Sequence, residues 1–146
     1  MKLKIDIDSS IQEPSIVIHT NEIDDKLKNI IEFIEQETRT KQINGRIGKD
    51  IYLIQIEDVY RFYIVDKVLT METKDKTYIV DYRLYEIEKI IANSFLKISK
   101  SEIINFDYVD YLSFTNSGHV QIFMKNKKST YSSRRYLKSI KELLKL

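Results

Sequence analysis

Hydrophobic and polar residues alternate in many short stretches of this chain, and short polar turns separate the stretches. Alternation with a period of two predicts β-strands, because successive side chains of a strand point to opposite faces. The middle of the chain has four such stretches in close succession, at residues 51–56, 60–65, 68–73 and 77–82. Their close spacing predicts an antiparallel meander.

The second half of the chain continues this pattern and adds two short helices. Apolar residues at helical spacing predict one helix near residues 84–91 and another near 137–144. Ser132 and Ser133 are candidates for the N-cap of the second helix. The short β-type runs between the helices are at residues 95–98, 103–104, 108–114, 119–124 and 129–131. The expected fold class is therefore mainly β, within the α+β group.

The beginning of the chain has a different organisation. Alternation predicts strands at residues 2–8 and, after Pro14, at residues 15–19. An amphipathic helix should follow, with Thr20 or Asn21 as its N-cap. Its apolar stripe consists of Ile23, Leu27, Ile30, Ile31 and Ile34.

Two glycines, Gly45 and Gly48, follow this helix and mark the expected joint to the meander. We therefore predict a β-β-α extension at residues 1–45 and a mainly β domain at residues 46–146. The extension is a candidate for regulation or dimerisation.

Composition narrows the class of protein. The 146 residues are 42% hydrophobic, with only 3 Gly and 1 Pro, so we expect the chain to fold throughout and to have no flexible linker. The chain has no cysteine, which excludes disulfides and thiolate metal sites and fits a cytoplasmic protein. No run of apolar residues is long enough for a signal peptide or a membrane span.

Charge is distributed unevenly along the chain. Residues 96–146 hold 10 of the 24 basic side chains but only 4 of the 22 acidic ones, although the net charge of the whole chain is only +2. A positive cluster attracts phosphates, so this imbalance suggests an anionic partner at the C-terminal end. The same lysines also suit the dipole of a C-terminal helix.

The sequence offers little for catalysis. Its three glycines cannot form a phosphate loop, and neither histidine has a partner at metal-ligand or triad spacing. The carboxylate pairs Asp6/Asp8 and Asp107/Asp110 are read most simply as solvated strand and turn faces. We therefore expect no enzymatic activity, no metal, no cofactor and no small-molecule substrate.

Two polar spots are candidate binding sites. Ser99, Lys100, Ser101 and Glu102 form a polar tetrad between two apolar runs that would hold it on a stiff base. The second spot, residues 132–135, has two serines and two arginines at the start of a helix, where a phosphate or a guanine edge would fit. A helix cap with a solvated arginine pair explains the second spot equally well.

From about Gly48 onward, the order of motifs resembles the LytTR domain, the DNA-binding module of many bacterial response regulators. The matching segments are the meander, the helix segment RLYEIEKII, the stretch FLKISKSEIINFDYVDYL and the ending YSSRRYLKSIKELL. Together they cover roughly two-thirds of the chain, and four motifs in the same order are much more specific than any one.

The resemblance implies a mostly β fold whose loops enter successive major grooves of double-stranded DNA. It implies that Ser101 and Asn105 hold the contacting loop in place. Many members of the family have His where this chain has Ser99, so the contact at that position is expected to differ. The implied DNA-binding residues are Lys67, Ser99, Lys100, Ser101, Arg134 and Arg135.

The N-terminal extension is too short for the receiver domain of a response regulator and lacks its parallel βαβ alternation. It resembles the extension of stand-alone LytTR regulators, which implies control by a membrane or signalling protein. The helix stripe within it can cover the meander of its own chain or the same surface of a second subunit, and of these we expect homodimerisation. The alternative function is a protein-interaction module, in which the helix face or a free edge strand docks a partner.

Overall fold

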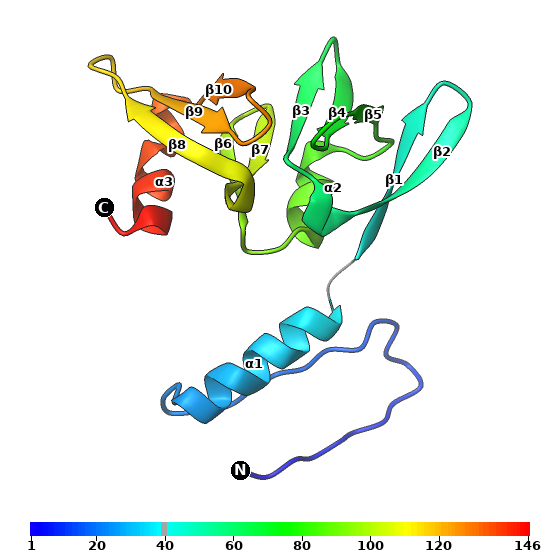
Figure 1. The fold of residues 1–146 in the computed structure, drawn as a ribbon. Coiled ribbons are helices and arrows are strands. Elements are labelled where there is room, and N and C mark those ends of the chain that lie inside the picture. The colour runs from blue at the N-terminus through cyan, green and yellow to red at the C-terminus, as the bar shows by residue number, and fades with distance from the viewer. Residues whose placement is uncertain (39–40) are drawn as a thin grey trace. The chain divides into compact units, whose positions relative to one another are not determined.

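The computed structural model describes residues 1–38 and 41–146 of the chain (Figure 1). It divides into two compact units, residues 1–37 and residues 38–146. The first unit contains an extended segment and helix α1 (Asp25–Thr38). None of the described helices is both long and apolar enough to cross a membrane.

The second unit contains ten strands, two α-helices and three short 3₁₀ turns among its described residues. The strands are β1 (Gln42–Ile47), β2 (Asp50–Gln55), β3 (Arg61–Val65), β4 (Val68–Glu72), β5 (Thr77–Ile79), β6 (Phe95–Ser99), β7 (Glu102–Asn105), β8 (Val109–Phe114), β9 (Val120–Met124) and β10 (Ser129–Tyr131). The helices are α2 (Leu84–Ile90) and α3 (Leu137–Leu144), and the 3₁₀ turns are η1 (Ile56–Asp58), η2 (Phe106–Tyr108) and η3 (Arg134–Tyr136).

The strands form two antiparallel sheets. The larger sheet has the order β2-β1-β5-β4-β3-β7-β6, and the smaller has the order β10-β9-β8. Tight turns connect most neighbours, as the alternating pattern predicts. The mainly β fold class is therefore confirmed, and so is the meander of β3, β4 and β5. The first stretch of the predicted meander, residues 51–56, is not part of it, because β2 pairs with β1 and lies away from β3 in the sheet order.

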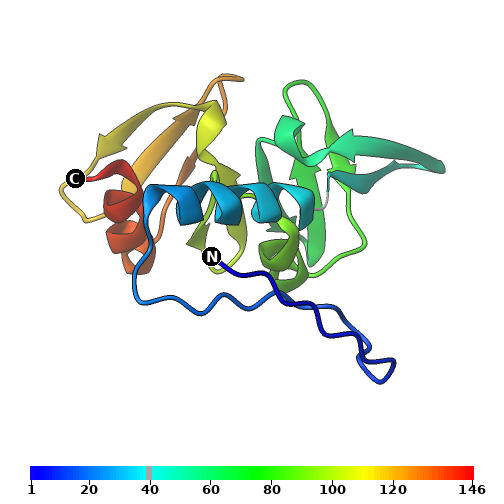
Figure 2. The same ribbon diagram turned by 90° about the horizontal axis from the view of Figure 1, so that it is seen from below.

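Each face of the larger sheet covers a different apolar core. Phe62, Met71 and Ile103 point to one face and pack with Leu84 and Ile87 of α2. Other apolar residues of the sheet pack with β9 and with Ile140 of α3; they include Ile98 and Ile104. Figures 1 and 2 show α2 beside the larger sheet and α3 beside the smaller one.

The two strands predicted at residues 2–8 and 15–19 are wrong. Both segments are extended but form no sheet, and their apolar side chains are open to solvent; Leu3 is 88% exposed and Ile7 is 95% exposed. A strand needs a hydrogen-bonded neighbour and a covered face, and this unit provides neither for these segments. The extension is therefore an extended segment followed by a helix.

The predicted N-cap of α1 is also wrong. Asp24 caps the helix, because its Oδ1 accepts the backbone N–H of Leu27 at 2.8 Å. Thr20 instead donates its hydroxyl to the backbone oxygen of Glu22. Most of the apolar stripe is present, with Leu27 buried and Ile30, Ile31 and Ile34 partly buried. Ile23 is not part of it, since this residue precedes the helix and is 58% exposed.

Gly45 does not mark a joint between domains, since it lies inside β1, which pairs with β2 and β5. A Cβ at this position would come within 2.7 Å of the Tyr78 side chain and 2.9 Å of Met71. Only glycine allows β1 to approach the neighbouring strands this closely. Gly48 has a φ of +58° and forms the turn between β1 and β2.

Candidate nucleic-acid interface

The β6–β7 turn presents the centre of the polar tetrad. Lys100 and Ser101 are exposed at this turn, and Ser99 is partly buried at the end of β6. The Ser101 N–H donates to Ser99 Oγ at 3.2 Å, and the Ser101 carbonyl accepts the N–H of Ile64 at 3.0 Å. These bonds tie the turn to itself and to β3, so Lys100 extends from a fixed backbone.

Glu102, the fourth member of the tetrad, is not part of the exposed turn. It begins β7, is only 7% exposed and receives hydrogen bonds from Arg61 and Thr130. The prediction that all four polar residues are presented together is therefore wrong for Glu102. Strand alternation explains the difference, because residue 102 points to the face that the smaller sheet covers.

Lys67 lies in the two-residue turn between β3 and β4. Asp66 and Lys67 have φ values of 49° and 64°, which is the geometry of the tight hairpin turns that match strand twist. Strand β3 also pairs with β7, with Tyr63 opposite Glu102. The β3–β4 and β6–β7 turns therefore lie at the same edge of the larger sheet.

A groove of about 730 Å³ lies beside these two turns, and we call it the cationic groove. Asp81 is its one acidic residue, whereas its five cationic residues are Arg46, Lys67, Arg83, Lys97 and Lys100. The structure thus brings together Lys67 and Lys100, which the resemblance implied. Arg46, Arg83 and Lys97 were missed, because they are isolated charges far apart in the sequence.

Arg134 and Arg135 are exposed in η3, which follows the smaller sheet. The N–H of Ser133 donates to the carbonyl of Ile98 at 2.9 Å. This bond ties the arginine segment to β6, next to the start of the β6–β7 turn. The arginines and the turn are thus neighbours in the fold, although they are over 30 residues apart in sequence.

The serines beside these arginines do not form the predicted anion site. Ser132 is buried, and its hydroxyl accepts the N–H of Val120 at 3.2 Å. Ser133 precedes η3 but makes no side-chain cap. Helix α3 begins only at Leu137, so two serine hydroxyls do not meet at its start.

Asn105 supports the fold at the far end of β7 from the β6–β7 turn. Its Nδ2 donates to the Val59 carbonyl at 3.0 Å, and its Oδ1 accepts the N–H of Asp107 at 3.1 Å. Asn105 therefore joins β7 to the chain before β3 and starts η2. Ser99 and Ser101 hold the β6–β7 turn, and Asn105 does not contribute to it.

An ionic network joins the two sheets, and no motif in the sequence predicts it. Glu72 of β4 is fully buried and accepts hydrogen bonds from Arg61, at 2.7 and 3.1 Å, from Lys128 and from Asn126. Arg61 also donates to Glu102 at 3.1 Å. Asn126 and Lys128 both lie in the β9–β10 turn of the smaller sheet, so the network spans the junction between the two sheets.

The two carboxylates of the network have opposite pKa shifts. Burial alone would raise the pKa of Glu72, but the hydrogen bonds and charge of Arg61, with Lys128 and Asn126, lower it below the ordinary value. Burial raises the pKa of Glu102, and the bonds from Thr130 and Arg61 offset this only in part. Burial alone would lower the pKa of the Arg61 guanidinium, but the hydrogen bond and charge of Glu72, with the charge of Glu102, raise it above the ordinary value.

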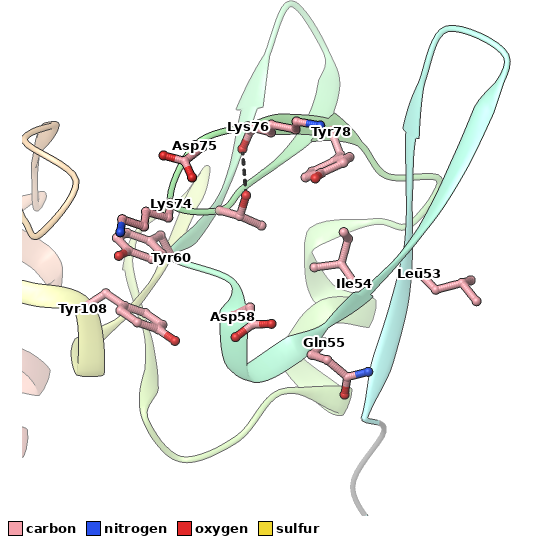
Figure 3. Close-up of a pocket in the computed structure, with 11 residues that line it drawn as sticks. Leu53, Ile54, Gln55, Asp58, Tyr60, Lys74, Asp75, Lys76, Tyr78 and Tyr108 are labelled. Atoms are coloured by element: carbon pink, nitrogen blue, oxygen red, sulfur yellow. Dashed lines mark hydrogen bonds between the residues drawn. The ribbon is translucent and has the colours of Figure 1, made fainter.

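A second hollow, of about 450 Å³, lies at the end of β4 that is opposite to Lys67 (Figure 3). Tyr60 and Tyr108 stack there with ring centroids 4.1 Å apart. Lys74 and Lys76 face this hollow together with two aspartates, Asp58 and Asp75, so its charges balance. The hollow therefore has no preference for a polyanion.

In the described chain, no group of three or more His, Asp or Glu side chains is placed to hold a metal ion.

The two sheets, with their cationic edge, define a mainly β domain that presents positive turns. Residues 49–145 match the model of the LytTr DNA-binding domain family. An uncharacterized HTH-type transcriptional regulator of Staphylococcus aureus (strain NCTC 8325 / PS 47) is 37% identical over 146 residues, covering 100% of this chain and 99% of the relative. A relative of the same description from strain MRSA252 is 36% identical with the same coverage.

The fold comparison agrees with the sequence comparison. A LytTr DNA-binding domain from Bacillus cereus superposes with a TM-score of 0.70 at 18% identity, covering 73% of this chain and 99% of the other. The chain belongs to the LytTR family. This is a family of DNA-binding domains and not of enzymes, as the sequence predicts.

Proposed function

We propose that the protein is a sequence-specific transcriptional regulator that binds double-stranded DNA through loops in successive major grooves. The observation that carries the proposal is the alignment of positive loops along one edge of the larger sheet. Arg134 and Arg135 adjoin β6, Lys100 follows β6, and Lys67 lies in the turn of the neighbouring hairpin. Family membership supports the same partner.

Each loop has a distinct proposed role. Lys100 extends from a turn fixed by Ser99 and Ser101, so its ammonium reaches the O6 and N7 atoms of a guanine or a phosphate with little loss of entropy. Arg134 and Arg135 supply two guanidinium forks, which match either a guanine edge or a phosphate. Lys67 makes the contact of the neighbouring hairpin.

The N-terminal unit has a proposed regulatory role. Large apolar side chains are exposed along its extended segment and on α1, including Ile16, Val17 and Phe33. We propose that this unit mediates homodimerisation in a cytoplasmic protein, since paired half-sites multiply specificity. If the chain is monomeric, the same exposed residues favour the second candidate function, in which this unit docks a membrane or signalling protein.

Salt dependence of DNA binding tests the proposed partner. A protein that neutralises phosphates loses affinity linearly on a plot of log K against log salt, with a slope of about −0.9 for each neutralised phosphate. We expect a steep slope for a duplex selected from a random pool. A flat plot, or no selected sequence, would favour the protein-interaction module.

A further inference from the structure

The cationic groove extends beyond the two turns that are proposed to contact bases. Its lining continues from Lys67 and Lys100 to β1 and to the start of α2, where Arg46 and Arg83 lie. In the larger sheet, β1 is two strands beyond β4, a distance of roughly 10 Å at the usual strand spacing. The positive surface is therefore longer than the two base-contacting turns require.

Not all of the five cations in the groove are available to a ligand. Arg46 pairs with Asp81 at 3.2 Å, and Lys97 pairs with Glu88 at 3.5 Å. Arg83, Lys67 and Lys100 form no ion pair with any residue in the described part of the chain. Arg83 is thus the unpaired cation of the groove that the resemblance did not assign.

The Arg83 side chain has no role in holding α2. Its backbone N–H donates to Glu86 Oε1 at 3.1 Å, and its carbonyl accepts the N–H of Glu86 at 2.9 Å. A guanidinium has only donors and cannot cap the first helical N–H groups. A substitution that shortens the side chain therefore leaves these backbone bonds in place.

The groove has the chemistry of a phosphate-binding surface. A guanidinium fork binds the oxygens of a phosphate in a bidentate manner, and the exposed Tyr82 and Tyr85 in the lining add hydroxyl donors. The occupant must be anionic, since the groove holds five cations and one carboxylate. Its continuity with Lys67 and Lys100 makes the DNA backbone next to the contacted bases the anion that reaches it.

We propose that Arg83, beside Tyr82 and Tyr85, binds backbone phosphates of the DNA that flank the base-contacting site. This inference rests on the proposed function. Phosphate contacts carry no sequence information, so Arg83 contributes to affinity for any duplex, whereas Lys100 contributes to the choice of sequence.

The test compares Arg83→Ala with the parent in the full chain, on a duplex selected by the parent. Loss of one phosphate contact should make the salt slope shallower by about 0.9, so the affinity ratio of parent to variant should change roughly 3.5-fold between about 50 and 200 mM salt. The variant should weaken binding to selected and scrambled duplexes by the same factor. On a selected duplex shortened on the flanking side, parent and variant should bind equally.

Lys74→Ala is the matched control, because Lys74 is an exposed cation at the opposite end of β4 from Lys67. It should leave the slope unchanged, and circular dichroism melting should show both variants folded. An unchanged slope for Arg83→Ala, or an equal loss on the shortened duplex, would overturn the phosphate assignment. If the parent itself selects no duplex, the proposed function fails first, which separates the two failures.

Discussion

Glu72→Gln tests the physical reading of the ionic network most sharply. The substitution keeps the shape of the side chain but removes the charge that four hydrogen bonds converge on. Arg61, whose side chain is only 13% exposed, then keeps Glu102 as its single carboxylate partner. Breaking a buried ion pair on one side costs about 3–5 kcal/mol, because the other charge is left without compensation in a low-dielectric site.

Some of that cost is recovered in this protein, because the amide oxygen still accepts one bond and Glu102 remains in place. We therefore expect the free energy of unfolding at pH 7 to fall by roughly 3 kcal/mol, or about 12–24 °C in Tm for a domain of this size. Urea unfolding followed by circular dichroism measures the change, and an unaltered m-value shows that the folded state is retained.

Glu102→Gln is the control within the same network. Burial raises the pKa of Glu102, so its ionised form is already unfavourable, and removing its charge should cost clearly less than removing that of Glu72. If Glu72→Gln costs under about 1 kcal/mol, or if Glu102→Gln costs more, the assignment of Glu72 as the principal partner of Arg61 is refuted.

The pH dependence follows from the sign of each shift. The pKa of Glu72 is lowered from its ordinary value of 4.5, so its contribution to stability is complete above that value and is lost as the pH falls through the folded-state pKa. The pKa of Glu102 is raised from 4.5, so its contribution is complete below that value and is lost as the pH rises through the folded-state pKa. Between pH 7 and pH 3, Glu72→Gln should therefore remove part of the acid destabilisation, whereas Glu102→Gln should increase it.

Three further predictions concern the interface, the sheet and the N-terminal unit. Lys100→Ala and Arg135→Ala should each weaken binding to a selected duplex by ~1–3 kcal/mol with folding intact, while Lys145→Ala should cost little; parent-like affinity of both variants in a fluorescence-anisotropy titration would show that the implied contacts are wrong. Gly45→Ala should lower the free energy of unfolding by about 1–3 kcal/mol, because the new Cβ overlaps Tyr78 and Met71, and a neutral result would mean that β1 can shift away. Residues 41–146 should sediment as a monomer and bind one half-site, while the full chain is dimeric; a full chain that is monomeric at tens of micromolar, on and off DNA, would remove the dimer proposal.

Strand alternation was enough to predict most strands of the domain, but not β1 or the division into two sheets. Runs such as β3 and β4 place every second side chain in a core, and that pattern is readable in one dimension. The same pattern failed at residues 2–8, where Leu3, Ile5 and Ile7 alternate but remain exposed. Alternation shows that a segment can form a strand, whereas a neighbouring strand decides whether it does.

The candidate site could be predicted only in part. Motif order led to Lys67, Lys100 and Arg135, but it could not show that Glu102 is buried or that Ser132 bonds inside the sheet. The burial of Glu102 and the hydrogen bond of Ser132 depend on which face of a strand the other sheet covers. Arg83 has no local signal, because its place in the same groove as Lys67 depends on how β4, β5 and the start of α2 come together in the fold.

Selection of bound sequences from a random pool of DNA duplexes tests the central claim most directly. We predict that the full chain enriches a defined motif and that the affinity of the full chain for this motif falls steeply with salt. Lys100→Ala should lose the enrichment. Recovery of random sequences by the full chain, or enrichment of the same motif by Lys100→Ala, would contradict sequence-specific recognition by the β6–β7 turn. Failure to retain any duplex at low salt would contradict DNA binding altogether.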